Sequence, residues 1–175
     1  TREEEKLARD VYLTLYETWG LQIFSNIAQS EQTHTESVRD LLEKYDITDP
    51  VTDDTIGVFA NDELQKLYND LTTRGNTSLE EALAVGAFVE DLDIYDLQQE
   101  ISKTDNQDIA LVYENLMRGS RNHMRAFISQ LTKRGESYTP QYITQAEFDS
   151  IIGTEKERGG SNSGGNRNRG GGRGN

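Results

Sequence analysis

The sequence predicts an all-α protein whose body is a bundle of four long helices arranged as two antiparallel hairpins. Apolar residues recur at helical spacing in four long segments. Short glycine-containing or polar turns join these segments in pairs, and one longer break separates the two pairs. A chain of 175 residues is long enough to bury one hydrophobic core of this kind.

The first predicted helix covers residues 2–19, and the second follows almost at once at 21–45. Gly20 stands between them, and glycine is the residue that most readily takes the left-handed conformation that ends a helix. A connection as short as this makes the two helices antiparallel neighbours.

Residues 46–77 interrupt the helical pattern. Pro50 and the polar run 52–55 predict a loop, and Asn61 predicts the N-cap of a short helix that ends near Gly75. This stretch is long enough to carry the chain along the whole bundle. We therefore expect the third long helix to run parallel to the second.

The third long helix begins with a capping box, Ser78 to Glu81, and continues to about Lys103. The fourth begins after Asp105 and ends before Gly135, and the short turn between them makes this pair antiparallel as well. Two hairpins joined by one long crossover form the ferritin-like arrangement rather than a simple up-down-up-down bundle.

The chain divides into three parts by composition. Residues 1–135 form the helical bundle, and residues 136–157 contain enough apolar side chains to dock on it as a C-terminal extension. Residues 158–175 are rich in Gly, Asn and Arg and cannot bury apolar surface. We expect this tail to contact the acidic surface of a neighbouring chain, so that the protein self-associates.

Charge and composition exclude several classes of function. Residues 1–155 carry 13 Lys and Arg against 30 Asp and Glu, a net charge of −17, which argues against nucleic acid as a partner. No apolar run approaches the ~20 residues of a membrane span. Cysteine is absent, so disulfides, thiolate zinc sites and iron–sulfur clusters are excluded. The lack of cysteine and of an initiator methionine slightly favours an extracellular or cell-surface location over the cytoplasm.

The two histidines of the chain fall inside apolar helical patterns, together with carboxylates. Glu31 and His34 lie 11 and 14 residues after Gly20, and Glu5 lies 15 residues before it. At ~1.5 Å per residue these side chains are within about one turn of the same depth. A lone glutamate in such a pattern is more often an exposed or paired charge. Polar residues that interrupt the apolar pattern of all four helices together indicate a metal site instead, with the ligands Glu5, Glu31, His34, Glu90 and His123.

The expected cofactors are one or more divalent metal ions, with iron the first choice and manganese or zinc the next. Four further residues lie near the expected site and are candidates for supporting roles: Tyr12, Asp93, Tyr95 and Ser120. The two tyrosines would be redox-active beside a metal, although packing in an aromatic core is the commoner role.

These residues carry a resemblance to a known superfamily. The run Glu-Glu-Glu-Lys-Leu-Ala-Arg-Asp-Val-Tyr at 3–12 and the run Gly-Ser-Arg-Asn-His at 119–123 resemble the ferritin-like superfamily and are similar to an uncharacterised prokaryotic family of ferritin-like domains. The resemblance covers roughly residues 1–135. Compared with rubrerythrin-like members, the matching positions are Glu5 with Ala8 and Tyr12, then Glu31 with His34, Glu90, and His123 with Phe127. It implies a dimetal oxidoreductase acting on dioxygen, peroxide or Fe²⁺.

One position departs from the family pattern, because Ser120 stands where the glutamate of a second Glu-x-x-His is expected. We expect an asymmetric site with fewer oxygen ligands near His123, unless Asp93 or Glu114 compensates. This gap leaves enzymatic activity open. The alternative is a structural protein that uses the bundle as a building block of an oligomer or filament, with the tail contacting neighbouring subunits.

Overall fold

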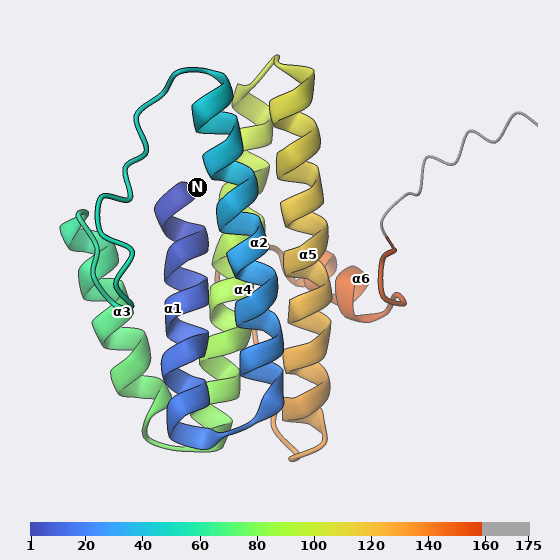
Figure 1. Cartoon of the computed structure of the whole chain (residues 1–175). Coiled ribbons are helices and arrows are strands. Elements are labelled where there is room, and N and C mark those ends of the chain that lie inside the picture. The colour runs from blue at the N-terminus through green and yellow to red at the C-terminus, as the bar shows by residue number, and fades with distance from the viewer. Residues whose placement is uncertain (159–175) are drawn as a thin grey trace, which may run out of the picture.

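The computed structural model describes residues 1–158, and all of the secondary structure in this range is helical (Figure 1). The prediction of an all-α protein is therefore confirmed. The expected tail lies, apart from Arg158, outside the described residues. The helices are α1 (Arg2–Trp19), α2 (Gln22–Lys44), α3 (Asp62–Gly75), α4 (Leu79–Lys103), α5 (Gln107–Thr132) and α6 (Gln145–Ile152).

Four long helices, α1, α2, α4 and α5, pack side by side, and α3 lies against α1 and α4 (Figure 1). The principal partner of α1 is α2, and that of α4 is α5. In each pair the chain reverses direction, whereas α2 and α4 run the same way because the crossover and α3 return the chain to the far end of the bundle (Figure 1). The bundle therefore brings residues from four separate segments to one depth.

The helix ends form where the local sequence indicates them. Gly20 ends α1 with φ 61°, in the left-handed region. The Asn61 side chain accepts from the backbone amide of Glu63 at 2.8 Å, and that of Ser78 accepts from Glu81 at 3.1 Å. Each cap satisfies an amide that has no partner within its own helix.

A buried ion pair fastens the crossover to α1. Lys6 Nζ lies 2.6 Å from Asp10 Oδ2 and donates to the carbonyls of Thr55 and Val58, both at 3.0 Å. The same Asp10 oxygen accepts from the amide of Gly57 at 2.9 Å. Both charged side chains are almost fully buried. A pair with its remaining donors and acceptors satisfied is tolerated in the interior, and here it fixes the path of a loop.

The C-terminal extension is anchored by a single carboxylate of α4. Buried Asp91 accepts from the hydroxyl of Tyr138 at 2.8 Å and from the backbone amides of Gln141, Tyr142 and Ile143 at 2.5, 3.2 and 2.9 Å. The extension also contains α6, which the sequence analysis did not predict. The sequence contained a signal for the start of α6, since Thr144 and Glu147 have the spacing of a capping box and the Thr144 side chain accepts from the amide of Glu147.

None of the helices between residues 1 and 158 combines the length and the apolar character that crossing a membrane requires.

The Asp91 contacts generate a stability prediction. Asp91→Ala removes the acceptor for three amides, of which that of Ile143 is buried and those of Gln141 and Tyr142 are partly buried. An unsatisfied buried donor costs ~1–3 kcal/mol. We expect the free energy of unfolding in urea to fall by about 3 kcal/mol. Limited proteolysis should cut near residues 138–143 before it cuts the bundle.

The matched control is Asp105→Ala, which removes an exposed carboxylate from the α4–α5 turn. It should change neither the unfolding free energy nor the proteolysis pattern. Equal behaviour of the two variants would show that Asp91 does not anchor the extension.

Candidate metal centre

The structure brings the five expected ligands together in the middle of the bundle. Helical spacing of i and i+3 puts Glu31 and His34 on one face of α2, while α1, α4 and α5 each contribute one further side chain. All five are buried, with exposed fractions of 0% for Glu5 and Glu31, 1% for Glu90, and 9% for each of His34 and His123.

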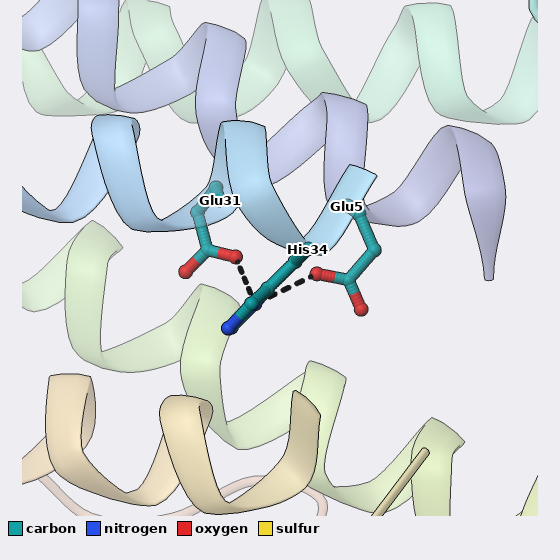
Figure 2. A group of neighbouring side chains, drawn as sticks. All are labelled: Glu5, Glu31 and His34. Atoms are coloured by element: carbon teal, nitrogen blue, oxygen red, sulfur yellow. Dashed lines mark hydrogen bonds and ion pairs between the residues drawn. The ribbon is translucent and has the colours of Figure 1, made fainter. Parts of the chain in front are cut away.

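The first half of the cluster surrounds His34. Its Nδ1 lies 2.7 Å from Oε2 of Glu31 and 3.2 Å from Oε2 of Glu5. Figure 2 shows the two carboxylates, one from α2 and one from α1, approaching the imidazole from different sides. Two carboxylates and one imidazole thus face a common point.

The second half surrounds His123 and shares Glu31 with the first. His123 Nδ1 lies 2.7 Å from Glu31 Oε1 and 3.5 Å from Glu90 Oε2. Glu31 therefore offers one oxygen to each imidazole, and the two rings stack with centroids 5.6 Å apart. In each group of two carboxylates and one histidine, the candidate ligand atoms lie within 4.8 Å of one another.

Several of these buried atoms lack a hydrogen-bond partner. Both oxygens of Glu31, Oε1 of Glu5 and Nδ1 of His123 form no hydrogen bond. Glu31 Oε1 and His123 Nδ1 lie 2.7 Å apart, yet they form no hydrogen bond, because a hydrogen bond also requires suitable angles and the geometry between them does not provide these. Buried polar groups are normally satisfied, so this concentration of unpaired ligand atoms fits a cation that binds them jointly.

The electrostatics show what the cluster does when no metal is present. Burial raises the pKa of Glu5 to about 7. Burial opposes the charging of His123, but attraction to Glu31 and Glu90 outweighs it and raises the pKa to about 10. For Glu31 the two imidazoles overcome the effect of burial and lower the pKa. Protons therefore compensate the buried carboxylates in the metal-free chain.

Two further polar residues contact the cluster. The fully buried hydroxyl of Tyr12 donates to Glu90 Oε1 at 2.6 Å and fixes that carboxylate. The hydroxyl of Ser120 donates to Asp93 Oδ2 at 2.7 Å. Burial and the neighbouring carboxylates raise the pKa of Asp93 well above its usual range, so this carboxyl group tends to hold a proton.

Two expectations require correction. Tyr95 is 38% exposed and lies against Tyr142 on the outside of α4, because its position on the helix faces away from the bundle axis. Glu114 is also exposed and does not compensate for Ser120. Each imidazole faces two carboxylates, and the number of oxygen ligands on a bound ion near His123 stays a prediction. Glu31 stands three residues before His34 on α2, and Ser120 stands three residues before His123 on α5. The helix α5 therefore lacks a carboxylate that would correspond to Glu31.

Sequence reasoning missed two residues beside the cluster. Ser30 lies with its Oγ 3.0 Å from His123 Nε2 and so helps to orient the ring. Gly119 lies against His34, since an added Cβ would approach Cε1 and Nε2 of the ring to 2.5 Å. The signal for Gly119 was its position in the interior of a long helix, where glycine is unfavourable unless something packs closely against it.

Comparison with known proteins gives a family without an assigned function. Residues 1–155 match the model of an uncharacterized protein domain, DUF2202. The uncharacterized protein MJ0754 of Methanocaldococcus jannaschii is 61% identical over 158 residues, which cover 90% of this chain and 85% of that protein. A crystal structure of the hypothetical protein MJ0754 superposes with a TM-score of 0.88 at 61% identity, covering 89% of each chain. The chain therefore belongs to the DUF2202 family of uncharacterized domains.

Proposed function

We propose that this protein binds two divalent metal ions within a ferritin-like helix bundle. One ion lies between Glu5, Glu31 and His34, and the other is held by Glu90 and His123 together with the second oxygen of Glu31. The observation that carries the proposal is that Glu31 presents one buried oxygen to each imidazole, with neither oxygen hydrogen-bonded. Bridging carboxylates with one imidazole per ion suit iron first, and manganese or zinc next.

A purely structural ion-pair cluster is the competing interpretation. Such a cluster is stable in the interior only when the remaining donors and acceptors are satisfied, as they are around Asp10. Here four of the six buried side-chain atoms without a hydrogen bond, counted over residues 1–158, belong to Glu5, Glu31 and His123. A metal ion satisfies ligand atoms through lone pairs, without requiring an N–H to point at each oxygen.

The function we propose for this centre is oxidoreductase chemistry on dioxygen, peroxide or Fe²⁺. A pair of redox-active metal ions held by these residues would supply the electron transfer that such chemistry requires. The chain itself supplies the positioned ligands, with Tyr12 fixing Glu90 and the Ser120–Asp93 pair standing where a second bridging carboxylate is missing. No cysteine is present to hold an iron–sulfur electron donor, so electrons must come from another molecule. The alternative of an assembly protein rested on the incomplete ligand set and on the tail, of which residues 159–175 lie outside the described part.

Metal content tests the proposal directly. We expect the chain reconstituted with Fe²⁺ under anaerobic conditions to retain two ions, measured by elemental analysis per chain. Glu31→Gln keeps the size of the side chain but removes the shared charge, so both ions should be lost. Glu90→Gln should weaken mainly the ion near His123.

The control for this experiment is Glu114→Gln, an exposed change of the same kind on α5, which should leave both ions bound. A wild-type chain that retains no metal, or a Glu31→Gln variant that retains two ions, contradicts the proposal.

The pKa shifts predict how metal binding depends on pH. Folding raises the pKa of Glu5 from 4.5 to about 7 and that of His123 from 6.5 to about 10. The folded chain therefore binds these protons more tightly than the unfolded chain, and the stability they contribute is lost as the pH rises through the folded values. A metal must displace the same protons, so its affinity rises with pH.

We expect the increase in melting temperature caused by Zn²⁺ to be larger at pH 8 than at pH 6. Differential scanning calorimetry with and without the metal measures this difference. Glu31→Gln should show no such increase at either pH. An increase that shrinks as the pH rises would contradict this assignment of protons.

Gly119→Ala tests the position of the ring of His34. The new methyl group would overlap this ring, whose two nearest atoms lie at 2.5 Å. Alanine is favoured over glycine in a helix by ~0.5–1 kcal/mol, so the backbone of α5 is not weakened. We expect metal content to fall from two ions toward one, with the ion at His123 retained. An unchanged content of two ions would show that His34 does not need this space.

A further inference from the structure

A groove of about 750 Å³ lies between α2 and α5, beside the metal centre. His123 and Gly119 line it, and Gly119 is also the residue packed on the ring of His34. The three carboxylates of the centre do not reach the groove and are essentially inaccessible, whereas both histidines retain some exposure. The groove therefore approaches the centre from its imidazole side.

The charge of the groove is opposite to that of the protein. The chain has a formal net charge of −13, yet none of the twelve residues that line the groove is an Asp or a Glu. Two of them, Arg125 and Lys156, are cations. Such a lining favours an anion over a cation.

The two cations differ in availability. Arg125 is engaged, because its guanidinium donates to the carbonyl of Ile151 at 2.7 Å and contacts Glu157 at 2.9 Å. Lys156 is exposed and has no ion-pair partner among residues 1–158. One positive charge in the groove is thus free to bind a ligand.

The position of Lys156 is set by the residue that follows it. Glu157 accepts from Arg121 at 2.7 and 2.5 Å, and its backbone amide donates to Asn122 Oδ1 at 2.8 Å. Asn122 in turn donates to the carbonyl of Glu157 at 3.1 Å. Several contacts therefore hold this segment against α5, next to His123, and bidentate arginine–carboxylate pairs are the strong ones of their kind.

The remaining lining is suited to a partly apolar molecule. Ile23 and Ile27 on α2 and Ala126 on α5 contribute hydrocarbon surface, and the hydroxyl of Ser129 adds a polar group. Binding pockets typically combine a mainly apolar wall with a few polar groups that set the orientation of the ligand.

We propose that this groove binds a small organic carboxylate with an apolar body, whose carboxylate pairs with Lys156. A monoanion matches the single free cation, and the isoleucines contact the hydrocarbon part. Its role as a substrate or ligand of the centre rests on the proposed function.

Benzoate is a suitable probe, with benzyl alcohol and benzylamine as its neutral and cationic analogues. Each is titrated into the full chain saturated with diamagnetic Zn²⁺, and amide shifts are followed by ¹H–¹⁵N NMR. We expect benzoate to shift the amides of Gly119, Asn122 and Ala126 and to bind most tightly, and benzylamine to bind least. Shifts confined to residues outside the groove, or an order with benzylamine tightest, overturn the proposal.

Two charge reversals sharpen the test. Lys156→Glu should weaken benzoate binding about tenfold, since an exposed pair is replaced by a repulsion, and should leave benzyl alcohol unchanged. Lys133→Glu is the control, because this lysine is exposed directly after the end of α5 and does not line the groove. Equal effects of the two reversals on benzoate overturn the assignment of Lys156. A chain that takes up no zinc yet binds benzoate in this way would contradict the metal centre and leave the groove intact.

Discussion

The burial of three carboxylates and two imidazoles at one depth of the bundle is the constraint on which the rest of this structure depends. Charges removed from water are costly unless they are paired or bind a cation. The buried groups come from four helices, and no single helix supplies a complete ligand group. The helices must therefore hold their relative depth accurately, and the fixed crossover contributes to this by tying residues 55–58 to α1.

Buried charges elsewhere in the chain show how this protein satisfies such groups when no ligand is involved. Asp10 accepts hydrogen bonds from a lysine and from a backbone amide, and Asp91 accepts them from a hydroxyl and from three backbone amides. Glu31 is equally buried, yet its oxygens face the two imidazoles and accept no hydrogen bond. The contrast within one molecule supports a binding role for the cluster, because the same bundle provides ample hydrogen bonds to carboxylates that serve the fold.

The surroundings of the cluster divide into two sides with different chemistry. On the α4 side, Tyr12 and the Ser120–Asp93 pair are buried and hydrogen-bonded, and burial with the neighbouring carboxylates raises the pKa of Asp93. On the α2–α5 side, Gly119 has no side chain and the groove comes down to His123. Small molecules would thus pass between solvent and the proposed centre along its imidazole side, past Lys156.

The sequence by itself determined the all-α class, the limits of the long helices to within a few residues, and the five clustered side chains, because helical periodicity and capping are local properties. The depth of Glu5 could be matched with those of Glu31 and His34 by counting from Gly20, since rise per residue is constant. Only the tertiary structure decided which carboxylate is shared, that Tyr95 faces outward, that Gly119 packs on His34, and that a groove without carboxylates lies beside His123. These features depend on the rotation of each helix about its axis and on contacts between residues far apart in the chain, which no local pattern encodes.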